Sequence, residues 1–563
     1  MDLDFALVGI GGVVLIVAAA AFSHRLGVAA PLLLVLVGIG YSFIPGIPNI
    51  EVDPELILMG VLPLLLYAAA IQLPVVDFRR NFGSISALSV LLVIGSAFLT
   101  GFVLFVILED LDLAAAIALG AVISPTDVVA ATAIGKRLGL PPRLLAILEG
   151  EGLVNDATAL VLLRSAIAAG ALSVSGTFDI AGSIGDFAYS VVVALALGLI
   201  VGFVSVVIRR RLGQPILDTA ISFAVPFIAY IPAEELHASG VIAVVASGIY
   251  SGHQSARLTP QSRIAERLNW RTLQFVLENG VFLLMGAQLS GIVTEIEQGD
   301  LAWHQAVALG VLLAGILMVL RFGFVWPLLF FVRRGEQRSA RRAARATGSL
   351  RRSEQARNDV KQYQAEGLGW RGGIVLGWAG MRGVVTLAAA QSLPRETPYY
   401  EQLVLIAFTV AIVTLLVQGG TLPLVIRWTG IRGSDRIADR RELATLLDEM
   451  QEAGLATLDA PRLRLPDGSD IDPAVIERVR HDTLLASEVA WERAKHADAD
   501  DGILQSPHQQ YRELRREVLQ VERDVLLDAR ARGAYPSRIL QRAQSLLDLE
   551  EARLEQMSTG GRD

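Results

Sequence analysis

The chain has 563 residues, of which 53% are hydrophobic and 19% charged, and its mean hydropathy is +0.50. Residues 434–563 hold 27 acidic and 19 basic side chains, whereas residues 1–433 hold 29 acidic and 30 basic ones. This pattern excludes a water-soluble enzyme with one large core, and an isoelectric point near 5.7 excludes a strongly basic nucleic-acid binder. The sequence has no cysteine, which excludes disulfides, thiolate metal sites and a cysteine nucleophile.

Apolar runs of about 18 or more residues, which are typical of membrane-spanning helices, recur along the first 433 residues. The sequence predicts about thirteen, at roughly 5–23, 29–48, 55–73, 86–108, 113–134, 143–170, 185–208, 215–232, 238–252, 272–293, 302–331, 370–393 and 402–427. We therefore expect an all-α polytopic membrane domain over residues 1–433, followed by a cytoplasmic, acidic, helical tail over residues 434–563.

The loops between these runs alternate in charge. Loops after odd-numbered spans carry basic residues: Arg25; Arg79 and Arg80; Lys136, Arg137 and Arg143; Arg209, Arg210 and Arg211; Arg257, Arg263 and Arg267. Loops after even-numbered spans are mostly acidic, and residues 333–361, after the eleventh span, hold ten basic against three acidic residues. Because positive loops stay in the cytoplasm, we expect an outside N-terminus and a cytoplasmic tail at the plasma membrane.

A charge at membrane depth is costly, so each one requires a reason. Asp127 follows Ser124, Pro125 and Thr126 about midway along the fifth span. Proline removes a backbone donor and leaves carbonyls unpaired beside Thr126 and the carboxylate, which is an oxygen-rich lining suited to a monovalent cation. The alternative is a proline kink with Asp127 capping the restarted helix.

The sixth span holds three more acids. Glu149 and Asp156 are seven residues apart and share a helix face, whereas Glu151 points elsewhere. Asp156 has no basic neighbour in the sequence, and burial without a fixed cation favours exchange of its proton for a cation. A purely structural buried aspartate is the alternative.

The twelfth span holds five glycines between residues 372 and 383, with Arg382 near its middle, which predicts a weak helix. Arg382 needs an acid, and Glu151 is the partner we expect. Arg164 and Arg321 are expected to be structural, paired or extended toward the cytoplasmic side. Glu278 either caps the start of a packed helix or polarises the site, and the structural interpretation is favoured. The broken fifth and weak twelfth spans lie an odd number of spans apart, which predicts inverted repeats with the binding site at the interrupted helices.

These motifs resemble the monovalent cation–proton antiporters, the Na+/H+ exchanger family, in its bacterial NhaP-like branch, over roughly residues 5–430. The matching segments are residues 124–127, 139–141, 148–151, 155–156, 237–245, 279–282 and 378–385. The resemblance implies a fold of the NhaA/NhaP type, in which two interrupted helices cross at mid-membrane. It also implies a homodimer, with a mobile core domain and a dimerisation domain, and no cofactor besides the transported ions.

The resemblance further implies that Asp156 carries the cation and the proton, with Asp127 and Thr126 as its partners around Na+. Asn155 takes a position that is a second aspartate in electrogenic relatives, and Glu151 with Arg382 resembles the family's buried ion pair. The sequence departs from the family at Gly152, where many relatives have serine, and at residues 67–69, which read Tyr-Ala-Ala instead of Phe-Glu-Ala. Two oxygen ligands are therefore missing.

We thus expect exchange of Na+, with K+ or Li+ as alternatives, for H+ by alternating access. One carboxylate beside Asn155 predicts an electroneutral one-for-one ratio. An intramembrane aspartyl protease using Asp127 and Asp156 is a competing hypothesis, although neither residue stands in a Tyr-Asp or Gly-x-Gly-Asp motif. A channel is a third.

Overall fold

The computed structural model describes residues 3–26, 29–44, 52–173, 180–296, 301–345, 368–431, 433, 436–459, 471–480, 507–531 and some positions between 543 and 554. The chain forms two compact units, residues 1–433 and residues 434–563.

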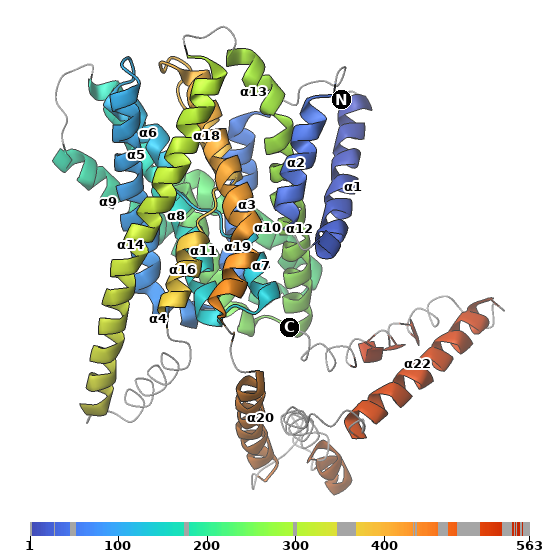
Figure 1. Cartoon of the computed structure of the whole chain (residues 1–563). Coiled ribbons are helices and arrows are strands. Elements are labelled where there is room, and N and C mark those ends of the chain that lie inside the picture. The colour runs from blue at the N-terminus through green and yellow to red at the C-terminus, as the bar shows by residue number, and fades with distance from the viewer. Residues whose placement is uncertain are drawn as a thin grey trace. The chain divides into compact units, whose positions relative to one another are not determined.

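The described residues of the first unit form helices joined by short non-helical segments (Figure 1). Its helices are α1 (Leu3–Leu26), α2 (Ala30–Ser42), α3 (Leu62–Gln72), α4 (Val75–Ser86), α5 (Val93–Ile107), α6 (Leu113–Ile123), α7 (Val129–Leu138), α8 (Pro142–Ser173), α9 (Ile180–Leu212), α10 (Pro215–Glu235), α11 (Gly240–Gln254), α12 (Pro260–Ala287), α13 (Leu289–Ile296), α14 (Trp303–Arg345), α16 (Trp370–Trp378), α17 (Val384–Gln391), α18 (Tyr400–Thr414) and α19 (Gly420–Thr429). Short π-helical turns, η1 (Leu56–Val61), η2 (Ala87–Leu92) and η4 (Leu415–Gly419), continue into α3, α5 and α19.

Every predicted apolar run coincides with one of these helices or with a consecutive pair. Within the described residues, seven helical stretches are long and apolar enough to cross a membrane, and four shorter apolar helices accompany them. Large apolar side chains on the outside remain exposed, such as Phe102 on α5 (58%) and Val319 on α14 (73%). Lipid contact explains such an apolar exterior. The all-α polytopic fold is therefore confirmed, while the figure of thirteen crossings stays a prediction.

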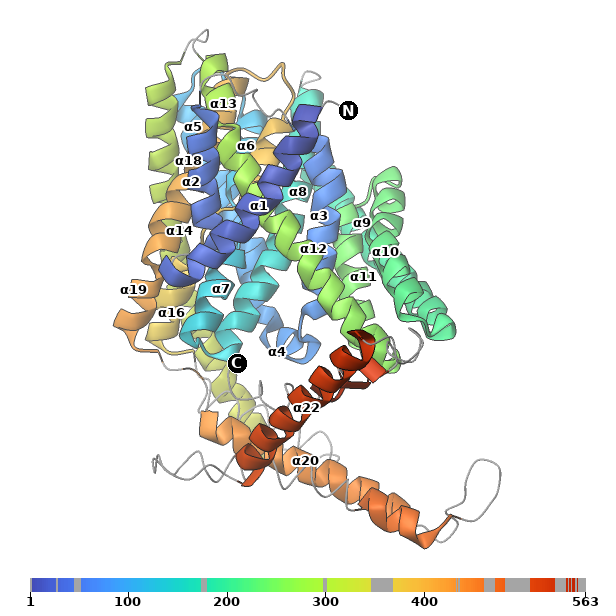
Figure 2. The same cartoon turned by 90° about the vertical axis from the view of Figure 1, so that its right-hand side faces the viewer.

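The helices pack as two bundles, and α9, α10 and α11 of the first bundle lie side by side (Figure 2). In the first bundle, α12 packs against α2, α10 and α3, and α11 packs against α9 and α3. In the second, α6 packs against α5 and α8, while α14 packs against α18 and α16. Fewer contacts join the two bundles, including those of α8 with α11 and of α12 with α17.

Two interrupted helices meet inside the second bundle. The chain leaves helical geometry between α6 and α7, at residues 124–128, and again between α16 and α17, at residues 379–383. The backbone N–H of Asp127 in the first break donates a hydrogen bond to the carbonyl of Met381 in the second, at 2.7 Å. The predicted crossing of two interrupted helices is thus confirmed. It places Asp127 beside Gly383.

The described parts of the second unit are helical as well. They include α20 (Arg436–Leu458), residues 473–480 and α22 (Pro507–Ala531). Arg515 of α22 pairs with Glu550 at 2.6 Å, which is an exposed contact of small energetic value. The spacing of Leu, Val and Ile among charges predicts helices over residues 440–456, 473–496 and 508–556 of this unit. Of these, residues 481–496, 532–542 and several positions between 545 and 556 lie outside the described residues.

The helix crossing predicts a strong effect of Gly383→Ala. A Cβ at residue 383 would lie 2.1 Å from Oδ2 of Asp127, so the two breaks must separate. We expect a destabilisation of about 1–3 kcal/mol, measured as a lower melting temperature of the detergent-purified protein, together with loss of function. Gly95→Ala on α5, where a Cβ meets nothing within 4 Å, is the control and should be neutral. Equal melting temperatures for both variants would contradict the tight crossing.

Candidate ion-binding site

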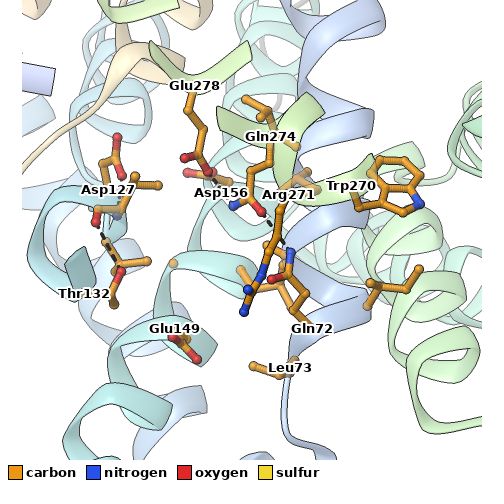
Figure 3. Close-up of a pocket in the computed structure, with 18 of the residues that line it drawn as sticks. Gln72, Leu73, Asp127, Thr132, Glu149, Asp156, Trp270, Arg271, Gln274 and Glu278 are labelled. Carbon is orange, nitrogen blue, oxygen red and sulfur yellow. Dashed lines mark hydrogen bonds between the residues drawn. The ribbon is translucent and has the colours of Figure 1, made fainter. Parts of the chain in front are cut away.

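A cavity of about 730 Å³ lies where α3 and α12 of the first bundle face α7 and α8 of the second (Figure 3). Its polar lining includes five acids near the helix break and on α8 and α12, two amides, a threonine and a set of basic residues. They are Asp127, Glu149, Asp156, Glu266, Glu278, Gln72, Gln274, Thr126, Lys136, Arg263, Arg267 and Arg271. Such a mixture suits a small hydrated ion better than a large apolar ligand.

Asp127 and Asp156 both reach this cavity, as the sequence predicts for a shared site. Asp127 Oδ1 accepts a hydrogen bond from the backbone N–H of Val129 at 2.8 Å, so this carboxylate also caps the restarted helix α7. Asp156 is half-buried on α8, and it forms no hydrogen bond or ion pair with any residue that the structure describes. Its carboxylate oxygens are therefore available to an ion or a proton.

Asn155 and Thr126 form the wall behind the two aspartates. Asn155 is fully buried, and its Nδ2 donates to the Thr126 carbonyl at 2.8 Å and to the Thr126 hydroxyl at 3.0 Å. Thr126 Oγ1 in turn donates to Glu151 Oε1 at 2.8 Å. Asn155 thus holds the broken segment against α8, and of the two only Thr126 lines the cavity.

Glu151 faces away from Asp156, as its spacing predicts, but its partner differs from the expected one. Both its oxygens accept from Arg321 of α14, one of them from Nη2 at 2.8 Å, and both side chains are about 1% exposed. The expected pair of Glu151 with Arg382 is therefore corrected to Glu151 with Arg321. Spacing fixes the face that Glu151 presents, but not which of two mid-span arginines packs on it.

Arg382 instead binds backbone carbonyls where the two interrupted helices cross. Its Nε donates to the carbonyl of Ile123, the last residue of α6, at 3.2 Å, and its Nη1 donates to the carbonyl of Gly380, just beyond α16, at 2.6 Å. These are carbonyls that an interrupted helix leaves without partners, and a cation is favoured at such C-terminal ends. Arg382 therefore stabilises both half-helices.

Arg164, expected near the cytoplasmic side, pairs with Glu234. Glu234 belongs to a loop that the charge alternation assigns to the outside, so those two expectations conflict.

The chain's departures from the resembling family also have structural causes. A Cβ at Gly152 would lie 2.4 Å from Cγ2 of Val128, so Val128 occupies the room of a serine side chain. Tyr67 is fully buried, and its ring packs on Trp270 with centroids 5.0 Å apart.

Sequence reasoning missed two features of the cavity. A buried ion pair joins Arg209 of α9 to Glu266 of α12 at 2.7 Å, although the sequence predicts that Arg209 lies in a loop. The amides of Gln72 and Gln274 also reach the cavity, where they bond each other at 3.0 Å. A neutral amide within an apolar run gives little signal in the sequence.

Comparison with known proteins shows the family of the chain. The profile of a family described as "Sodium/hydrogen exchanger, transmembrane" matches residues 12–428. An uncharacterized Na+/H+ exchanger of Mycobacterium tuberculosis is 29% identical over 550 residues, covering 96% of this chain and 94% of its own. A sodium, potassium, lithium and rubidium/H+ antiporter of Bacillus pumilus is 30% identical over 471 residues, and the match covers 78% of this chain and 66% of that antiporter.

The fold is similar to that of a solved structure. The sodium proton antiporter MjNhaP1 of Methanocaldococcus jannaschii superposes with a TM-score of 0.56 at 15% identity, covering 75% of this chain and 97% of that one. At this identity the likeness concerns the fold.

The corrected ion pair predicts a pattern in double substitutions. Glu151→Met alone leaves the Arg321 guanidinium buried without its counter-ion, which should cost about 3–5 kcal/mol and lower the melting temperature steeply. Adding Arg321→Met removes the stranded charge, so the double variant should recover most of the loss. The matched control is Glu151→Met with Arg382→Met, which should be less stable than either single variant. Recovery by the Arg382 substitution instead would restore the original assignment.

Proposed function

Because the chain belongs to the sodium/hydrogen exchanger family, we propose that it exchanges Na+ for H+ across the plasma membrane, with Asp156 as the group that carries each ion in turn. It is a transporter and not an enzyme, and the ions are its substrates. The comparisons support neither a protease nor a channel. The transport unit is residues 1–433.

One observation carries the choice of Asp156. Of the acids on α8, Glu149 pairs with Lys136 at 2.8 Å and Glu151 pairs with Arg321, so each has a fixed counter-ion. Asp156, on the same helix, has none among the described residues, and it lies in the same cavity as Asp127. A carboxylate in a low-dielectric site needs a positive partner, and a mobile Na+ or H+ supplies it.

The neighbouring residues then have distinct roles. Asp127 provides a second carboxylate and Thr126 an oxygen for the dehydrated ion, while Asn155 keeps Thr126 in place. Since Asp156 holds either Na+ or H+ but not both, loading one ion displaces the other. The loaded second bundle then moves against the first and opens the site to the opposite side. An empty, charged site is too costly to move through hydrocarbon, which couples the two fluxes.

Ion choice follows from the same groups. Asn155 is neutral where an electrogenic relative would carry a second acid, so one proton leaves for each cation and the exchange is electroneutral. The Bacillus pumilus relative is named for sodium, potassium, lithium and rubidium, which supports K+ and Li+ as further substrates. The absence of a side chain at Gly152 also removes one ligand that would favour the smallest ions.

We also propose on which side of the membrane the N-terminus and the tail lie. The charge alternation supports an outside N-terminus and a cytoplasmic tail, residues 434–563. We infer a homodimer from the family resemblance.

Asp156→Asn should abolish Na+-dependent proton movement in proteoliposomes that carry a pH gradient, because the amide cannot alternate between an ion and a proton. Glu149→Gln is the matched control, since it removes an acid of the same helix and cavity that already has a counter-ion, and it should retain exchange. Exchange by Asp156→Asn at the wild-type rate would refute the assignment.

The electroneutral ratio has its own test. Each elementary charge moved across 100 mV contributes about 2.3 kcal/mol, so a ratio of one Na+ per H+ predicts no response to voltage. We expect the same wild-type exchange rate when a gradient of the membrane-permeant cation tetraphenylphosphonium, in place of a transported metal ion, sets the membrane potential at zero or at a negative value. A steep dependence on voltage would show that more than one proton moves.

A further inference from the structure

The cavity has a carboxylate on the wall opposite to Asp127 and Asp156. Glu278 belongs to α12 in the first bundle, whereas the two aspartates belong to the second. Figure 3 shows its side chain extending from α12 into the cavity toward the level of Asp156. A structural role for Glu278, as the sequence favours, would not require it to reach this space.

Glu278 is held by neutral hydrogen-bond partners and has no direct ion pair among the described residues. Gln274 Nε2 donates to Glu278 Oε1 at 2.6 Å, and Gln274 Oε1 accepts from Gln72 Nε2 at 3.0 Å. Both partners are neutral amides. Among the described side chains no basic group lies within ion-pair distance of Glu278, whereas Glu149 and Glu266 in the same cavity each have one.

Glu278 lies at the end of a row of charged and polar residues along α12. Arg263, Arg267, Arg271, Gln274 and Glu278 all line the cavity at spacings of three or four residues, so they form one stripe on the helix. The stripe begins with three arginines near the start of α12, and its inner end is the carboxylate. A cation that comes in from the arginine end meets repulsion first and the negative charge afterwards.

We propose that Glu278 is a positioning residue for the transported cation: it attracts the ion past the arginines and releases it to Asp127 and Asp156. This inference rests on the proposed exchange function. A carboxylate and the amide oxygens beside it offer the hard ligands that a monovalent cation prefers. Because Glu278 belongs to the first bundle, it faces the aspartates only while the site opens toward the arginine end. It therefore assists loading from one side of the membrane, which the charge alternation makes the cytoplasmic side.

The experiment compares the wild type with Glu278→Gln, which keeps the shape and can still accept the hydrogen bond from Gln274. Everted vesicles present the arginine end to the medium, and right-side-out vesicles present the other end. In everted vesicles we expect the KM for Na+ to rise roughly five- to twentyfold with kcat within a factor of about two. In right-side-out vesicles we expect no change in KM. A salt of impermeant ions, added to the medium of the everted vesicles, should raise the KM of the wild type more than the KM of Glu278→Gln. The added ions screen the attraction between the Glu278 carboxylate and the entering Na+.

Two further variants separate charge from structure. Glu278→Asp keeps the charge and should restore a low KM in part. The double variant Glu149→Gln with Lys136→Gln removes a neutral ion pair from the same cavity and should leave KM near the wild-type value. An unchanged KM for Glu278→Gln, or an equal rise from both sides, would overturn the inference while Na+/H+ exchange itself persists. If the wild type exchanges no cation at all, the proposed function fails, and the inference fails with it.

Discussion

Two helices broken inside a membrane domain create the constraint on which this structure depends. Each break leaves backbone N–H and C=O groups without helical partners, and hydrocarbon offers no water to satisfy them. The chain resolves this by crossing the breaks, so that the Asp127 amide bonds the Met381 carbonyl. Arg382 satisfies carbonyls at the ends of α6 and α16. Gly383 makes the approach possible because it has no side chain against Asp127. The ion site is built on this junction.

Charge pairing then separates structural acids from functional ones. A buried carboxylate whose arginine is bonded through two nitrogens, such as Glu151 with Arg321, is fixed for as long as the fold persists. A carboxylate in the same helix without such a partner is stable only with a mobile positive ion. The α8 helix contains both kinds within one and a half turns, because residues 151 and 156 face different directions. The same helix can therefore lock the bundle together and leave a binding group open.

Much of this arrangement could be predicted from the sequence, since it follows from local chemistry. Pro125 and the glycines before residue 383 mark the two breaks, and the seven-residue spacing of Glu149 and Asp156 places both in one cavity. The partner of Glu151 could not be predicted, because periodicity gives the face of a residue on its own helix but not the rotation of a distant one. The requirement that Arg382 find an acid was also too narrow. Two helix C-termini supply the negative potential that a buried guanidinium needs.

The cavity is lined by residues of both bundles. The aspartates stand on the bundle that contains the helix crossing, and the stripe on α12 stands on the other. Sparse contacts between bundles make a relative movement less costly than a rearrangement within either one, because a packed core resists deformation while an interface can be exchanged. In the proposed exchange cycle, a charge on the α12 wall therefore acts on the ion in one orientation only. A protein with a single carrier carboxylate can in this way have different affinities on its two sides without changing the groups that bind the ion.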